Sequence, residues 1–159
     1  MGRVLNRNKE SKRRKGKRGK GKSKEILLKI FSTNAAGLKL KIQSLKNEIN
    51  TTNAAIFTVQ ETHFAKKGKL KVDGFEIFEA IRKKKKDGGT LMGIHKGLKP
   101  MLIKEYSDKF ELLIVEVTAG DKEIRVISGY GPQENWPEDD RMPFFMALVY
   151  LMEYLKDII

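Results

Sequence analysis

Three polar residues stand where predicted strands end, and their side chains are of the types that hold a metal ion beside a phosphate. Asn34 follows a first predicted strand, Glu61 follows a second, and Tyr130 ends the last one. If these strands are neighbours in one sheet, their ends meet at one edge, where ligand sites are common. Amide and carboxylate oxygens suit Mg²⁺, and a phenol can orient a phosphate or an attacking water. The pattern therefore predicts a metal-dependent site for phosphodiester chemistry.

Each of these residues also has a purely structural explanation. An asparagine after a strand is often a turn residue. A glutamate at a strand end is often solvated, and a terminal tyrosine often packs half-buried. From spacing alone these explanations are the commoner ones. Whether the three side chains share one edge of the sheet decides between the two interpretations.

Apolar periodicity predicts the elements that must position these side chains. A helix is expected over residues 38–50, between buried strands at 26–32 and 54–60, which is a β-α-β unit. Further strands are expected at 74–81, 89–95, 110–118 and 123–130, and a final helix at 143–157. This order predicts an α+β class, a layered α/β sandwich with one mixed, mainly antiparallel sheet and helices on one face.

The positive charge is concentrated in an amino-terminal tail, residues 1–24, ahead of a single domain over residues 25–159. The tail holds twelve of the 33 lysines and arginines and one acid, whereas the remaining 135 residues hold 21 bases and 19 acids. It has too few apolar side chains to offset the entropy of ordering, so we expect it to be disordered. We expect it to bind nucleic-acid phosphates. The alternative is a solvated arm without a partner. The densest basic cluster is Arg13, Arg14, Lys15, Lys17 and Arg18.

Composition excludes several other classes. The chain has no cysteine, so disulfides and thiolate metal sites are excluded. No apolar segment follows the amino-terminal charges as in a signal peptide, and the apolar carboxy-terminal stretch is too short and interrupted to span a membrane. We expect a nuclear protein, or otherwise a cytoplasmic one, that is not secreted. Its expected partner is DNA or RNA, with no membrane and no small-molecule cofactor.

Four segments, in order and with matching spacing, resemble the motifs of the endonuclease/exonuclease/phosphatase superfamily. They include an Asn shortly before a Gly, a strand closing in Gln-Glu-Thr, a Gly-Gly strand and a strand ending in Tyr-x-Pro. The most similar subgroup is the endonuclease domain that accompanies reverse transcriptase in non-LTR retrotransposons. The resemblance covers roughly Glu25 to Phe145, and four motifs in register are specific where one alone is not. The matching segments are Phe31–Gly37, Ala55–His63, Asp87–Ile94 and Arg125–Glu134.

The resemblance implies a Mg²⁺-dependent DNA endonuclease, with Mn²⁺ as an alternative ion, and it implies roles for the matching residues. Glu61 would be the main metal ligand, Asn34 would lie in the metal and phosphate site, and Tyr130 would contact the scissile phosphate. Gln60 would support the site from behind, and His63 would lie near the substrate groove, its alternative being a surface turn residue.

A basic run over residues 82–86 is placed by the strand pattern at a hairpin tip. There Arg82 and Lys84 are expected to reach the DNA backbone. A solvated tip that blocks edge pairing is the alternative.

The resemblance implies only the amino half of a four-layer fold. The family's Gly-Asp-x-Asn and Ser-Asp-His motifs do not follow Tyr130, so whether the chain is catalytically complete stays open. The inner face of the sheet is then expected to be an apolar patch that this chain leaves exposed. A second copy or a partner chain is expected to cover it. The alternatives to a nuclease half are a non-catalytic basic nucleic-acid-binding module and a phosphatase relative acting on small or lipid phosphoesters.

Overall fold

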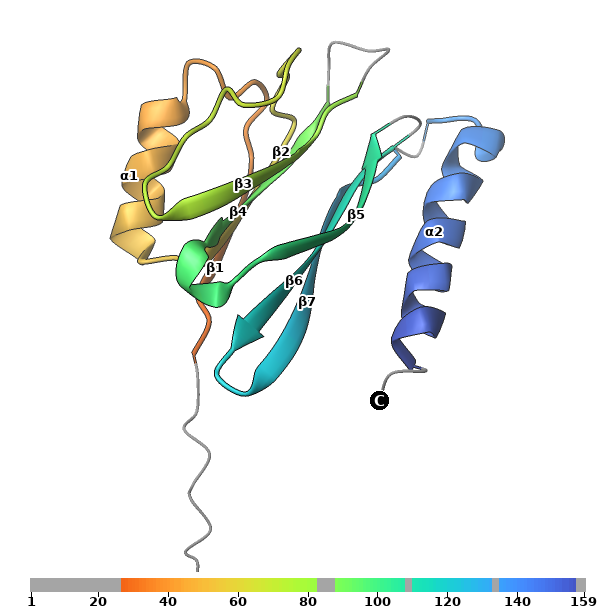
Figure 1. The fold of residues 1–159 in the computed structure, drawn as a ribbon. Helices are drawn as coiled ribbons and strands as arrows, with labels where there is room; N and C mark the ends of the chain where they lie inside the picture. Colours follow the sequence, from red (N-terminus) through yellow and green to blue (C-terminus); the bar gives the residue numbers. More distant parts are fainter. Residues whose placement is uncertain (1–26, 83–87, 108–109, 133–134, 157–159) are drawn as a thin grey trace, which may run out of the picture.

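The chain is arranged in four layers, in the order helix, sheet, sheet, helix (Figure 1). The computed structural model describes residues 27–82, 88–107, 110–132 and 135–156. The first sheet has four strands in the order β1 (Ile30–Asn34), β2 (Ile56–Gln60), β4 (Thr90–His95), β3 (Phe75–Ala80). The second has three, in the order β5 (Met101–Ser107), β6 (Glu111–Ala119), β7 (Lys122–Tyr130). The helices are α1 (Ile42–Thr52) and α2 (Glu138–Lys156), and a 3-10 turn, η1 (Lys96–Leu98), precedes β5.

The predicted β-α-β unit forms the first part of this arrangement. β1 and β2 are parallel, and α1 crosses between them over the outer face of the first sheet. Leu45 and Ile49, one helical turn apart, are buried against Phe57 and Val59 of β2. α1 ends at Asn53, whose left-handed conformation closes the helix. The unit fixes the direction and register of the two strands that precede Asn34 and Glu61.

The inner face of the first sheet is covered by the second sheet of the same chain. Ile56, Met92 and Ile94 on one side pack against Leu113 and Val115 on the other, all five fully buried. The α+β class is confirmed, but the expectations of one sheet and of an exposed inner face were wrong. The physical reason is that β6 is buried on both faces and must itself lie between two layers.

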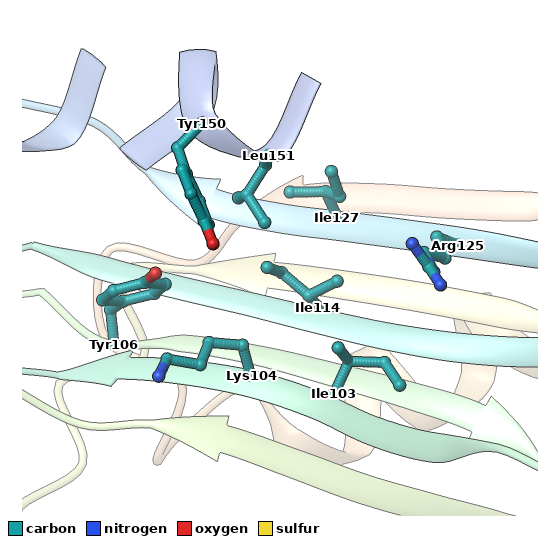
Figure 2. Close-up of a pocket in the computed structure, with 8 residues that line it drawn as sticks. All are labelled: Ile103, Lys104, Tyr106, Ile114, Arg125, Ile127, Tyr150 and Leu151. Atoms are coloured by element: carbon teal, nitrogen blue, oxygen red, sulfur yellow. The ribbon is translucent and has the colours of Figure 1, made fainter. Parts of the chain in front are cut away.

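The two helices lie on opposite outer faces, not on one face as expected. Phe144 of α2 packs with Leu112 and Ile114 on the outer face of the second sheet. Between α2 and this sheet lies a cavity of about 300 Å³, which Figure 2 shows from the side. Its lining residues are Ile103, Lys104, Tyr106, Ile114, Arg125, Ile127, Tyr150 and Leu151. Among the described residues no helix has the length and apolar character needed to cross a membrane.

β5 is a strand that the sequence pattern did not predict. It is an edge strand paired only with β6, and its register shifts between Leu102 and Lys104. Met101, Leu102 and Ile103 are all partly exposed, so this apolar run lacks the alternation that marks a half-buried strand.

Truncating a side chain between the sheets should be costly, whereas truncating one on the exposed β1 edge should not. We expect Met92→Ala, at a fully buried position, to lower the free energy of unfolding by about 2–5 kcal/mol. Ile30→Ala, at a position 59% exposed, should stay within about 0.5 kcal/mol. Urea unfolding followed by circular dichroism measures both, and equal small effects would contradict the face-to-face packing.

Candidate functional site

The carboxyl ends of β1 and β2 bring Asn34 and Glu61 together. Asn34 is paired in register with Gln60, so Glu61 is the next residue beyond the pair. The segments that follow β1 and β2 stay hydrogen-bonded to each other beyond the strands. The N–H of Gly37 donates to the carbonyl of Glu61 at 2.8 Å, and the N–H of Leu38 donates to the carbonyl of Thr62 at 3.0 Å. Backbone hydrogen bonds therefore hold the two turns side by side.

Two side chains converge on the carboxylate of Glu61, one from each sheet. The Tyr130 hydroxyl donates to Glu61 Oε1 at 2.8 Å, although the two residues are 69 positions apart. Asn34 makes a side-chain hydrogen bond to the same carboxylate. The Asn34 Oδ1 accepts from the backbone N–H of Ala36 at 3.0 Å, which leaves the amide N–H group to face Glu61. A carboxylate thus lies between an amide and a phenol.

These contacts favour the ionised form of Glu61. The hydrogen bonds from Asn34 and then Tyr130 lower the pKa of Glu61 below its ordinary value. Desolvation opposes them by less than either hydrogen bond contributes, and the electrostatic influence of His63 lowers the pKa by the smallest amount. A carboxylate with a lowered pKa is charged at neutral pH and remains available to a cation.

The backbone of this turn is strained. Glu61 and His63 adopt left-handed conformations with φ of 53° and 55°, which residues other than glycine seldom do. The strain is held by hydrogen bonds from Thr62 N–H to the Gly89 carbonyl at 3.1 Å and from His63 N–H to the Gly88 carbonyl at 2.9 Å. The Gly-Gly pair is required here, because a Cβ on Gly89 would lie 2.6 Å from the Thr62 hydroxyl.

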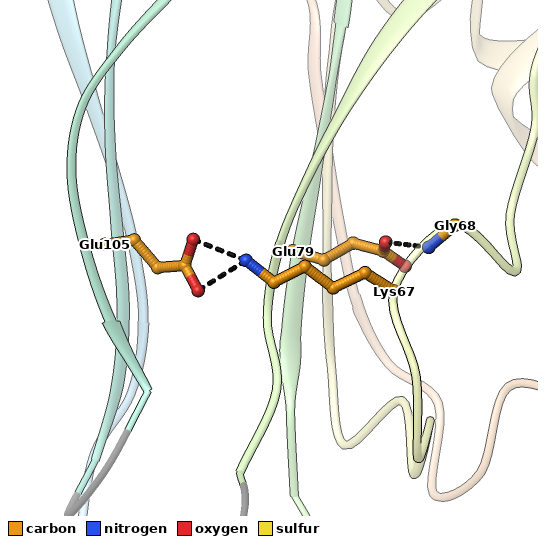
Figure 3. A network of polar contacts seen from close by, with 4 residues as sticks. All are labelled: Lys67, Gly68, Glu79 and Glu105. Carbon is orange, nitrogen blue, oxygen red and sulfur yellow. Dashed lines mark hydrogen bonds and ion pairs between the residues drawn. The ribbon is translucent and has the colours of Figure 1, made fainter.

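The loop that follows His63 is anchored to both sheets. Figure 3 shows Lys67 reaching Glu105 on β5, with Nζ 2.6 Å from both carboxylate oxygens. On β3, Glu79 accepts the backbone N–H of Gly68. Burial raises the pKa of Glu79, and the Gly68 hydrogen bond partly offsets this. The anchors limit how far the loop beside Glu61 can move.

The other predicted site residues have different surroundings. Gln60 is half-buried at the end of β2, and its carbonyl accepts from Ala35 N–H at 2.9 Å. His63 is exposed, and a Cβ added to Gly37 would lie 3.4 Å from its Nδ1. Arg82 does not extend from a tip into solvent, because its side chain is 7% exposed and paired with Glu111. Lys84 and the tail residues Arg13, Arg14, Lys15, Lys17 and Arg18 lie outside the described residues.

The donor set at Glu61 suits an ion that needs few protein ligands. The described residues contain no group of three or more histidines, cysteines or acids placed to hold a metal. Glu61 offers one carboxylate, and Asn34 Oδ1, which accepts from Ala36 N–H, has a second lone pair. Mg²⁺ keeps several waters and commonly binds to one or two carboxylates plus substrate phosphate. The residues present therefore fit Mg²⁺ better than an ion that requires a closed protein cage.

Sequence patterns did not single out Glu111 and Trp136, which lie near Tyr130 and Arg82 in the structure. Glu111 opens β6 with no exposure, and Trp136 lies 5.0 Å from the Arg82 guanidinium, measured to the ring centroid. The only signal in the sequence was an acid placed between Phe110 and a run of buried aliphatic residues, where an unpaired charge would be costly.

By sequence, the chain matches no protein-family description and no curated protein. By structure, it is similar to the endonuclease domain of TRAS1, a telomere-specific non-LTR retrotransposon, with 18% identity and a TM-score of 0.56 over 76% of this chain and 53% of that one. It is also similar to the AP endonuclease LMAP from Leishmania major, with 18% identity and a TM-score of 0.57 over 74% of this chain and 44% of that one. A third match is D. rerio TDP2 complexed with a single-strand DNA product, with 14% identity and a TM-score of 0.57 over 79% of this chain and 54% of that one.

The chain therefore shares the fold of these solved structures, which agrees with the fold that the four motifs predicted. At these identities the likeness concerns the fold. The chain spans about half the length of these solved structures.

Removing the Asn34 side chain should weaken the preference of Glu61 for its charged form. We expect Asn34→Ala to raise the pKa of Glu61 toward its ordinary value of 4.5, because the largest lowering contact is lost. A lowered pKa stabilises the folded protein at pH values above the group's ordinary pKa, and this contribution is lost as the pH falls through the lowered pKa. Asn34→Ala should therefore reduce the free energy of unfolding, relative to wild type, more at pH 7 than at pH 3. Carbon-13 NMR titration of glutamate carboxyls measures the pKa, with Thr33→Ala as the neighbouring control. An unchanged pKa would show that Asn34 does not act on Glu61.

Proposed function

We propose that this chain is the amino half of a Mg²⁺-dependent DNA endonuclease of the retrotransposon type, catalysing phosphodiester hydrolysis when the whole site is present. The observation that carries the proposal is the convergence of Asn34 and Tyr130 on the Glu61 carboxylate at the end of a parallel strand pair. Three oxygen- or nitrogen-bearing groups at one edge match what a phosphate and its cation need. The fold shared with the TRAS1 endonuclease domain and the Leishmania major AP endonuclease supports the same class.

Each side chain has a role that follows from its contacts. Glu61, kept ionised by its neighbours, would bind Mg²⁺, and the ion when bound would stabilise negative charge on a phosphate oxygen. Asn34 orients the Glu61 carboxylate and keeps one oxygen lone pair for the ion's water shell. Tyr130 donates to Glu61, and once an ion binds that carboxylate the single O–H would turn to donate to a phosphate oxygen instead.

The surrounding residues would hold the nucleic acid in place. His63 is exposed next to Glu61 and would contact the backbone of a bound strand. The tail supplies non-specific attraction through its excess of positive charge. The sequence after Tyr130 contains neither Gly-Asp-x-Asn nor Ser-Asp-His, so we expect the chain by itself to bind metal and DNA but to cleave little.

The metal site is tested by titrating the chain with Mn²⁺ and following free Mn²⁺ by electron paramagnetic resonance. We expect Glu61→Gln to weaken binding at least about tenfold, because the one carboxylate that the described residues place at the site becomes neutral. Glu48→Gln, an exposed acid on α1, is the matched control and should leave binding unchanged.

Plasmid nicking with Mg²⁺ should be slight for wild type and for Glu61→Gln alike. If wild type and Glu61→Gln bind Mn²⁺ with the same affinity, the proposed site is refuted and the non-catalytic nucleic-acid-binding alternative is favoured. Strong nicking abolished by Glu61→Gln would show that the family's later motifs are dispensable.

DNA binding should depend on the tail and on salt. Deleting residues 1–24 removes a net charge of +11, so we expect affinity for duplex DNA to fall sharply at low salt. The dependence of log affinity on log salt should also become shallower, because fewer counterions are released. Fluorescence anisotropy at several salt concentrations measures both, and unchanged affinity and slope would eliminate the tail as a nucleic-acid arm.

A further inference from the structure

A fully buried carboxylate lies behind the proposed site. Glu111, the first residue of β6, has no exposed surface and is flanked by the buried residues Phe110 and Leu112. A buried charge is costly unless it is paired and hydrogen-bonded. The residues that contact Glu111 therefore indicate which part of the structure its buried charge stabilises.

The carboxylate is held by the Arg82 guanidinium and by one backbone donor. Arg82 Nη2 donates to Glu111 Oε2 at 2.7 Å, and its Nε lies against the other oxygen. The backbone N–H of Gly89 also reaches that oxygen, at 3.3 Å. The Arg82 side chain is 7% exposed, so solvent hardly screens the pair. We call these two residues the Arg82–Glu111 pair.

One route leads from this pair to Glu61 through an aromatic ring. Glu111 and Tyr130 are directly opposite in the β6–β7 register, so both side chains leave the sheet on the same side. The Arg82 guanidinium carbon lies 5.8 Å from the centre of the Tyr130 ring and 5.0 Å from that of Trp136, within range of a cation–π contact. The Tyr130 hydroxyl then donates to Glu61 at 2.8 Å.

A second route leads through the backbone. Gly89 donates to Glu111, and its carbonyl accepts the N–H of Thr62, the residue after Glu61. The left-handed conformations of Glu61 and His63 depend on this segment for their hydrogen bonds. A Cβ on Gly88 would lie 3.0 Å from Glu111 Oε1, so the turn packs directly on the pair. The Arg82–Glu111 pair therefore contacts both the Tyr130 ring and the Gly88–Gly89 segment that holds the turn at Glu61.

We propose that the Arg82–Glu111 pair positions Glu61, holding the Tyr130 ring and the Gly88–Gly89 turn so that phenol and carboxylate meet. Arg82 is thus a positioning residue of the site and not a DNA contact at a hairpin tip. Its planar guanidinium, which reaches both Glu111 oxygens, and its cation–π contact with Tyr130 are both required, and lysine has no planar group to supply them. The inference rests on the proposed function only in taking Glu61 as the metal ligand.

The test uses the full chain with ring-labelled tyrosine, in which Tyr130→Phe assigns the Tyr130 NMR signal. We expect Arg82→Lys to move that signal toward the value of an unconstrained tyrosine and to weaken Mn²⁺ binding about tenfold, as loss of a group supporting a metal ligand does. Arg125→Lys is the matched control, because Arg125 also forms an ion pair with a glutamate of β6, its Nε donating to Glu116 Oε2 at 3.0 Å. It should change neither the Tyr130 signal nor the affinity.

A second variant covers the case in which Arg82→Lys does not fold. The double substitution Arg82→Met with Glu111→Leu removes both charges together and replaces the pair with apolar groups, which buried pairs often tolerate. It should show the same two changes. Folded variants that keep the wild-type Tyr130 signal and Mn²⁺ affinity would overturn the inference. If wild type itself binds no Mn²⁺ through Glu61, the proposed function fails, and the Tyr130 signal alone decides this inference.

Discussion

The parallel pairing of β1 with β2 is the constraint on which the site depends. It places Asn34 opposite Gln60, and hydrogen bonds from Gly37 and Leu38 continue the pairing into the turns beyond. A shift of one residue would move Asn34 to the other face of the sheet and away from Glu61. The register is fixed because β2 is buried on both faces, and α1 spans the two strands with its apolar side on the sheet. The core packing thus determines where the amide meets the carboxylate.

The second sheet contributes to the site as well as to stability. Tyr130 is the last residue of β7, and it reaches Glu61 only because the two sheets pack face to face through Met92, Ile94 and Val115. The strained turn at Glu61 and the buried charge of Glu111 both oppose folding, and the apolar layers offset them. The free energy of core packing therefore offsets the cost of holding one carboxylate between a phenol and an amide.

Local patterns were enough to predict part of this arrangement. Helical spacing in α1 and the apolar runs at β1 and β2 predicted the β-α-β unit, and the strand ends predicted that Asn34 and Glu61 would be neighbours. The first strand was expected to be buried, but β1 is a partly exposed edge strand, because only β2 pairs with it. Periodicity shows which face of a strand is buried but not what covers it, so the second sheet and the opposite placement of α2 were not foreseen. Arg82 opens a run of lysines that suggested solvent, and its pairing with Glu111, 29 residues away, has no local signature.

Crystals soaked in Mn²⁺ would test the central claim most directly, because the anomalous signal locates the ion without assumption. The account predicts a single strong peak about 2.1 Å from a Glu61 carboxylate oxygen, with Asn34 and Tyr130 around it. Such a peak would place the cation where the β1–β2 pairing and the second sheet converge. A peak elsewhere on the chain, with the Glu61 carboxylate bound only to Asn34 and Tyr130, would contradict the account.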